Sequence, residues 1–323
     1  MKNMAKTSTA PDLRPRSAGE LIKGNFFILF STIFFGVNIP VAKILIPDWM
    51  SSVDLTLFRL LGGCILMWIA SAFVRTERIA RHDYLRIFLG GALGLFCFMY
   101  LFNLSLRYGD PIDISIIMTF PPVFVILIGI LFQHRRATWL EIGGVITAFA
   151  GAVIVIASEH GGEKGSDNLL GDLLAFASTL CYAFYLVILE RPMRTYRPVS
   201  MLRWVFLMSC IPEVFLLPSL PHAEIFHSSD WLPWTCIAFV LLCPTFLSYF
   251  LINPAEKLIG SELVSMYQYF LPVVATIASV IMKVATIRWF QIVAMVFIVA
   301  GMLITDIAKR RQRLKSASVS GQK

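Results

Sequence analysis

The stretch NLSLRYGDPIDISIIMTFPPVFVILIGILFQ at 103–133 has a counterpart 150 residues later (253 − 103 = 150), NPAEKLIGSELVSMYQYFLPVVATIASVIMK at 253–283. The ungapped shift pairs Asn103 with Asn253, Ser115 with Ser265, Phe120 with Phe270, Pro122 with Pro272, Trp139 with Trp289 and Gly151 with Gly301. Apolar sequences often match by chance, but Asn, Pro, Trp and Gly recurring without a gap indicate a duplicated chain. Upstream, at a slightly smaller offset, Phe58-Arg59-Leu60 resembles Leu202-Arg203-Trp204.

Composition places this duplicated chain in a membrane. Of its 323 residues, 57% are hydrophobic and 15% are charged, whereas an average soluble domain carries about a quarter charged residues. The net charge of +8 comes from short basic runs between apolar segments. That pattern is typical of membrane topology and argues against a nucleic-acid partner. We therefore expect an all-α integral membrane protein in contact with the lipid bilayer.

Ten apolar stretches approach the length of about 20 residues that a membrane-spanning helix needs. They cover about 25–46, 53–74, 84–106, 111–132, 138–158, 169–190, 199–220, 231–252, 260–283 and 287–307. With the N-terminus placed inside, roughly 22 of the 28 Lys and Arg residues fall on the inner side, a strong positive-inside signal. The sequence therefore predicts a multi-pass protein of the cell membrane with both termini in the cytoplasm.

Two halves of five helices each must insert with opposite orientation, because five is an odd number. Inverted repeats place a solute site near the middle of the membrane and move by rocking one half against the other. The predicted division is a cytoplasmic tail over 1–23, a first repeat over 24–158, a linker over 159–168, a second repeat over 169–307 and a basic cytoplasmic tail over 308–323. We expect a secondary transporter of a small-molecule solute.

Several motifs resemble the EamA branch of the drug/metabolite transporter superfamily. They are the run STIFFGVNIPVAK at Ser31–Lys43, Asn103 followed by Tyr108, the Pro-Val-Phe of Pro122–Phe124, and Gly151. The resemblance covers nearly the whole chain and implies ten helices, cytoplasmic termini, and export or exchange of small metabolites such as amino acids.

One departure from the family pattern concerns an acidic residue. Members commonly carry a Gly-Glu pair at the end of the fourth and ninth helices, where this chain has His134-Arg135 and Val284-Ala285. Whatever that acid does elsewhere is absent here or has moved, with Glu141 as the candidate.

Prolines and polar side chains mark the predicted site. Pro122 and Pro272 are predicted to kink the fourth and ninth helices, because proline removes a helical hydrogen bond. Aromatic and hydrogen-bonding groups at this level are what a small-molecule site needs, although Tyr near a helix end is often an interface anchor. The predicted solute-binding residues are Tyr100, Asn103, Thr119, Tyr182, Tyr185, Tyr249, Asn253, Gln268 and Tyr269.

Three charged residues inside apolar segments are candidates for coupling or charge recognition, because ionisable groups are costly there. Glu213 follows Pro212 well inside the predicted seventh helix and is the candidate for proton coupling, since an apolar environment disfavours the ionised carboxylate. Arg59 and Lys43 could hold a carboxylate-bearing solute or anchor at the outer headgroups.

Other functions are less well supported. The chain has no GxxxxGK[ST] phosphate loop, so gradient-driven transport is favoured over ATP-driven transport. The five His residues fall in loops on both sides, whereas a membrane-embedded transferase would need convergent acid–base groups; we expect no enzyme. A channel or a receptor without a transport cycle stays open as an alternative. No cofactor or metal is expected, because no Cys forms a CxxC pair. The sequence makes no prediction about a homodimer.

Overall fold

The computed structural model describes residues 18–132, 138–158, 165–218, 223–227, 229–259, 264 and 267–320, and its regular elements in these ranges are helices. The first half holds α1 (Ala18–Leu45), α2 (Ser52–Phe73), α3 (Tyr84–Phe88), η2 (Leu89–Leu95), α4 (Phe96–Tyr108), α5 (Pro111–Ile117), α6 (Pro121–Phe132) and α7 (Trp139–Ser158). The second half holds α8 (Gly165–Thr195), α9 (Pro198–Glu213), α10 (Leu232–Val240), η5 (Leu241–Leu247), α11 (Ser248–Ile259), η6 (Gln268–Phe270), α13 (Leu271–Ile281) and α14 (Trp289–Ser320). Short 3₁₀ turns lie at Arg81–Asp83 and Glu224–His227.

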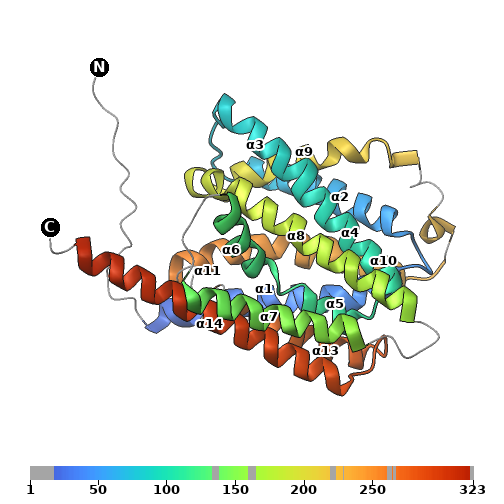
Figure 1. Ribbon diagram of the computed structural model, residues 1–323. Helices are drawn as coiled ribbons and strands as arrows, with labels where there is room; N and C mark the ends of the chain where they lie inside the picture. Colours follow the sequence, from blue (N-terminus) through green and yellow to red (C-terminus); the bar gives the residue numbers. More distant parts are fainter. Residues whose placement is uncertain are drawn as a thin grey trace.

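These elements form an elongated bundle in which α1 begins and α14 ends at the same end (Figure 1). We call this the basic end, because Arg86 and Arg191 lie there, at the start of α3 and near the finish of α8. The opposite end holds the turn between α1 and α2 and the turn between α4 and α5.

The described helices agree with the predicted ten-helix architecture, and several of them are candidate membrane spans. Six helical segments are long and apolar enough to cross a membrane, and three shorter apolar helices lie at Trp139–Val155, Leu271–Ile281 and Trp289–Thr305. The helix α9 completes ten. Large apolar side chains are exposed around the bundle, including Phe73 (85%) and Ile146 (63%). Such surfaces suit a hydrocarbon environment, where apolar side chains need no burial in protein.

Interrupted helices recur at equivalent places in the two halves. A π-helical segment, with wider turns than an α-helix, divides the third span at Leu89–Leu95 and the eighth span at Leu241–Leu247. The fourth span breaks between α5 and α6, and the ninth span changes from the 3₁₀ turn η6 into α13. This pattern is what two copies of one five-helix unit produce.

The prolines start new helices, whereas a kink within one continuous helix was predicted. Pro122 is the second residue of α6, and Pro272 is the second residue of α13. The N–H groups of a first helical turn have no partner within the helix, so proline loses no hydrogen bond there. In the first half the carbonyl of Phe120 accepts the N–H groups of Val123 (2.9 Å) and Phe124 (3.2 Å). The helix of the fourth span is therefore interrupted between Ile117 and Pro121.

The repeat-equivalent helices α7 and α14 share more contact than any other pair of described elements. Each begins with a matching side-chain cap: Glu141 accepts the N–H of Thr138 (3.0 Å), and Gln291 accepts the N–H of Arg288 (2.7 Å). Such caps satisfy N–H groups that the first turn leaves without partners. Glu141, the candidate for a relocated functional acid, is buried and serves here as a helix cap.

Candidate functional site

A cavity of about 690 Å³ lies between the two halves; we call it the central cavity. Its walls come from α1, α2, α4 and the α5–α6 break in the first half, and from α8, α9, η5, α11 and α13 in the second. None of the described lining residues comes from α7 or α14. Its polar lining residues are Ser31, Thr32, Asn38, Arg59, Tyr182, Tyr185, Glu190 and Tyr249. The remaining wall is mainly apolar and aromatic.

Arg59 is the charged group in the part of the cavity far from the basic end. It lies two turns into α2, which starts at the opposite end, and its side chain is only 4% exposed. The guanidinium carbon lies 5.9 Å from the centre of the Phe102 ring, and Tyr249 is near enough for an electrostatic interaction. Its Nε has no hydrogen-bond partner among the described residues.

Aromatic rings surround the middle of the cavity. Tyr182 and Tyr185 stack with ring centres 5.5 Å apart, and Phe98 lies 4.7 Å from Tyr182. On the other side, Tyr249 meets Phe35 edge to face at 6.3 Å. These rings present flat apolar faces with hydroxyl groups at their rims, which suits a small amphipathic solute.

Family comparison agrees with this architecture of two halves around a cavity. The EamA-like transporter family model matches residues 22–157 and again 169–305, which together cover most of the chain. The chain belongs to the EamA-like transporter family. It is therefore a multi-pass membrane transporter, and transport implies a solute as its substrate.

Several curated proteins are similar to this chain. The "Uncharacterized transporter YvbV" of Bacillus subtilis (strain 168) is 24% identical over 326 residues, covering 99% of this chain and 98% of that protein. The "Uncharacterized transporter YyaM" of the same organism is 28% identical over 222 residues, 66% of this chain and 70% of that protein. A "Probable terminal-alkyne amino-acid exporter" of Streptantibioticus cattleyicolor is 26% identical over 142 residues, 44% of this chain and 48% of that protein.

A solved structure shares the fold. One crystal structure of a protein with 16% sequence identity superposes with a TM-score of 0.58, covering 88% of this chain and 98% of that chain. At that identity the likeness concerns the fold alone.

The structure brings some of the predicted site residues of this EamA-like chain together. Arg59, Tyr182, Tyr185 and Tyr249 all line the central cavity. The side chains of Asn253 and Gln268 lie outside the described residues. Tyr269 packs against the larger hydrophobic core.

Three predicted polar residues of the first half contact other residues of that half instead. The amide of Asn103 donates to Thr56 Oγ1 at 2.9 Å and so joins α4 to α2. The hydroxyl of Thr119 donates to the Ile116 carbonyl at 2.7 Å, and Tyr100 stacks on Phe96 at 6.1 Å. None of these three is among the residues that line the cavity.

Lys43 lies at the opposite end of the bundle, where its Nζ donates to the carbonyls of Leu106 (2.5 Å) and Gly109 (3.0 Å). These carbonyls end α4, and a lysine cation suits the negative end of a helix. Nearby, burial raises the pKa of Asp110, while the Ile112 N–H and the cations Arg288 and Lys43 act in the opposite direction. These contacts join α1 to the end of α4 beside the start of α5.

Glu213 is the last residue of α9, whereas the sequence placed it well inside a helix extending to 220. The helix ends one residue after Pro212, and the Val214 N–H donates to the Ile211 carbonyl at 3.3 Å. The carboxylate is fully buried and faces the Cys210 thiol, but it has no hydrogen bond of ordinary geometry among the described residues. It is not among the residues that line the central cavity.

Sequence reasoning missed the polar face of α1 as a wall of the cavity. Ser31, Thr32 and Asn38 line the cavity, and the Oδ1 atom of Asn38 has no hydrogen-bond partner among the described residues. Ser31 and Asn38 are seven residues apart, which is two helical turns and places them on one face. Two polar residues at this spacing within an apolar run are the feature of the sequence that could have identified this face of α1.

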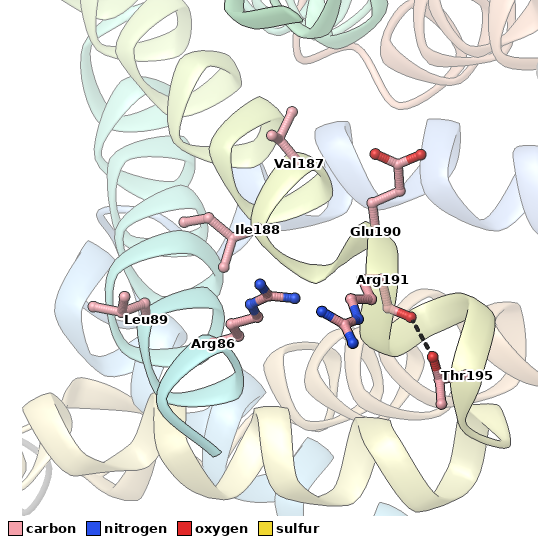
Figure 2. Close-up of a pocket in the computed structure, with 7 residues that line it drawn as sticks. All are labelled: Arg86, Leu89, Val187, Ile188, Glu190, Arg191 and Thr195. Atoms are coloured by element: carbon pink, nitrogen blue, oxygen red, sulfur yellow. Dashed lines mark hydrogen bonds between the residues drawn. The ribbon is translucent and has the colours of Figure 1, made fainter. Parts of the chain in front are cut away.

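A second hollow of about 640 Å³ lies at the basic end between α3 and α8. We call it the arginine groove; it is lined by Arg86, Leu89, Val187, Ile188, Glu190, Arg191 and Thr195. Figure 2 shows the guanidinium groups of Arg86 and Arg191 pointing toward one another, with Glu190 directed away from both. Val187 and Glu190 also line the central cavity, so the two hollows adjoin at α8.

Proposed function

We propose that this transporter carries small metabolites such as amino acids out of the cell, or exchanges them, by alternating access between its two halves. The observation that supports this most directly is the central cavity, whose walls come from both halves and include the interrupted helices. In inverted-repeat carriers, solute sites lie between the halves at broken helices, and rocking of the halves opens them alternately.

The size and lining of the cavity fit such a solute. Small-molecule sites occupy roughly 300–1,000 Å³ and combine apolar walls with a few polar groups, and the central cavity of about 690 Å³ lies within that range. The name of the Streptantibioticus cattleyicolor relative, "Probable terminal-alkyne amino-acid exporter", favours the same class of solute.

The basic end is proposed to face the cytoplasm, because cytoplasmic connections carry the excess of Lys and Arg. The central cavity reaches this end through Glu190, Met193 and Pro198. At the opposite end, Lys43 ties α1 to the end of α4, and the Ile225 N–H donates to the Trp49 carbonyl at 2.9 Å. The structure then corresponds to a conformation open toward the cytoplasm.

Counterflow in proteoliposomes tests this function. Vesicles preloaded with each proteinogenic amino acid should accumulate the same labelled amino acid transiently for at least one of them, and the rate should saturate with concentration. Flux that neither saturates nor shows counterflow would indicate a channel. No flux across a panel of amino acids and nucleosides would contradict the proposal.

Glu213 remains the proposed proton-coupling residue, because it is buried and acidic. If it couples protons to transport, Glu213→Gln removes the pH dependence of flux while counterflow persists. Unchanged pH dependence excludes this role.

A further inference from the structure

We infer that Arg59 binds the carboxylate of the transported solute, whose apolar part lies among the aromatic rings of the central cavity. This deepens the proposed transport function and rests on it. The observation that carries it is a buried cation facing a solute-sized cavity, with a nitrogen that no described protein group satisfies.

Burying a guanidinium group away from water is unfavourable unless an anion and hydrogen-bond acceptors compensate it. Here the compensation from the protein is weak: one aromatic face at 5.9 Å and the nearby Tyr249 hydroxyl. Among the described residues, no carboxylate lies within ion-pair distance of Arg59. A carboxylate that enters with the solute supplies both the charge and the acceptors.

The geometry of a guanidinium group suits a carboxylate. The planar guanidinium group matches the two oxygens of a carboxylate with two parallel hydrogen bonds. The rings of Phe102, Tyr182 and Tyr249 leave room beside it for an apolar or aromatic body. The acid Glu190 lies eight residues beyond Tyr182 on α8, about 12 Å along the helix axis. Glu190 is the acid among the described residues that line the cavity, so the part of the site around Arg59 suits a carboxylate.

The repeat supplies a matched comparison. Arg203 occupies the corresponding place in the second half but lies over the rings of Trp68 (5.2 Å) and Trp204 (5.9 Å). It is not among the residues that line the central cavity. Arg203 is thus a partly buried arginine whose Nε likewise has no hydrogen-bond partner among the described residues, but which does not line the cavity.

The test uses pairs of probes that differ only in the carboxylate. Phenylacetate and phenylacetamide, and leucine and leucinamide, are added to the purified protein, and the shift of its thermal unfolding midpoint gives the dissociation constant. We expect at least one acid to bind wild type and the amides to bind about 100-fold more weakly. Arg59→Gln should remove this preference, and Arg203→Gln should keep it.

Arg59→Lys provides a second test if Arg59→Gln does not fold, because lysine retains the positive charge. It should bind the same acid about 10-fold more weakly than wild type does. A carboxylate preference that survives in Arg59→Gln, amides that bind as well as acids, or no binding by any proteinogenic amino acid or simple monocarboxylate would overturn the assignment. Counterflow of a solute lacking a carboxylate would leave the transport function standing while removing Arg59 from it.

A separate observation supports a second site. We propose that the arginine groove binds the phosphate of an anionic phospholipid at the basic end. Two guanidinium groups that face each other repel unless an anion lies between them, and Figure 2 shows this arrangement for Arg86 and Arg191. Beside the groove, η2 packs tightly against α8, because a Cβ on Gly90 would lie only 2.6 Å from Leu189 Cγ.

The surface around the groove favours lipid over free phosphate. Leu85 (66% exposed) and Phe88 (38%) lie beside Arg86 on the outer surface of the bundle, where acyl chains would run. Basic pockets between spanning helices at the cytoplasmic side suit anionic headgroups.

Native mass spectrometry with phosphatidylglycerol, phosphatidylcholine and inorganic phosphate tests the lipid site. Wild type should retain phosphatidylglycerol preferentially, and the double variant Arg86→Gln/Arg191→Gln should retain about 10-fold less. Arg81→Gln, an exposed arginine at the same end that does not line the groove, is the control and should bind like wild type. Equal retention of both lipids, or binding of inorganic phosphate alone, would overturn the proposal.

Discussion

The pair α7 and α14 differs from the eight spans that enclose the cavity. Gly144 and Gly301 bring the two backbones into contact: a Cβ on Gly144 would lie 2.7 Å from the Gly301 carbonyl oxygen. Both helices are continuous, and neither contributes a described residue to the cavity. The third, fourth, eighth and ninth spans are interrupted and carry several of the lining side chains.

The two groups of helices differ in how their backbones are accommodated in the membrane. In lipid, helices associate through close packing of small residues, because there is no water to drive apolar surfaces together. An unbroken helix with glycine at its interface is suited to that role. Interrupted backbone is tolerated where it faces protein or a water-filled cavity. In each half, the fifth helix therefore packs against its counterpart, forming the scaffold pair α7 and α14, and the other four spans form the walls of the central cavity.

The largest predicted effect concerns the scaffold pair. Gly144→Leu should lower the thermal unfolding midpoint strongly and deplete the monodisperse protein, because the new side chain meets the backbone of α14 at Gly301 and Thr305. Overpacking typically costs about 1–3 kcal/mol and more where backbone must move. Fluorescence-detected size exclusion during a temperature ramp measures it.

The neighbouring residue is the control. A Cβ on Gly143 would meet nothing within 4 Å, so Gly143→Leu should shift the midpoint little. Because leucine has a higher helix propensity than glycine, equal losses for both variants would show that the α7–α14 contact does not account for the effect.

A smaller effect is expected where the scaffold joins the transport helices. The buried Gln291 donates from Nε2 to Asp113 Oδ1 at 2.9 Å, linking α14 to α5, and it also caps the Arg288 N–H. Gln291→Leu removes the amide donor to Asp113 and the cap, which should lower stability by about 2 kcal/mol. Unfolding in mixed micelles with increasing denaturing detergent measures the change.

Gln291→Glu separates the two contributions. It keeps an acceptor for the Arg288 N–H but places a carboxylate against Asp113, so its stability should recover as falling pH protonates one of the pair. If Gln291→Glu matches wild type at neutral pH, the hydrogen bond to Asp113 does not contribute to stability.

Sequence patterns predicted the number of spans, the repeat and the level at which the helices break, because these follow from apolar length and from Pro122 and Pro272. They did not predict which face of each helix meets the cavity. Asn103 turns toward Thr56, whereas Asn38 faces the cavity. In a membrane, lipid and protein interior are both apolar, so hydrophobic periodicity does not define the rotation of a helix about its axis.

Helix ends were missed for a related reason. The apolar run after Pro212 continues to Leu217, so hydrophobicity extended the predicted seventh helix beyond Glu213, where α9 ends. Arg59 was recognisable as a charge in an apolar segment, but its access to solute depended on packing among α2, α4 and α11 that no single segment encodes.

The smallest predicted effect lies at the basic end, where the loops after α2 and α8 meet. Arg197 Nε lies 3.1 Å from Glu77 Oε1, and the two side chains are 55% and 43% exposed. Exposed ion pairs contribute about 0.2–1 kcal/mol and weaken with salt. A double-mutant cycle of Glu77→Gln and Arg197→Gln should therefore give a coupling energy below about 1 kcal/mol in thermal unfolding, falling further in 1 M salt.

Weak coupling between Glu77 and Arg197 is consistent with the proposed transport cycle, in which the loops at this end of the cavity separate. A salt-independent coupling energy as large as the stability loss in Gln291→Leu would contradict this expectation. It would show that the loops at the basic end are joined as strongly as α7 and α14, so that the difference between the scaffold pair and the cavity-lining helices would not extend to these loops.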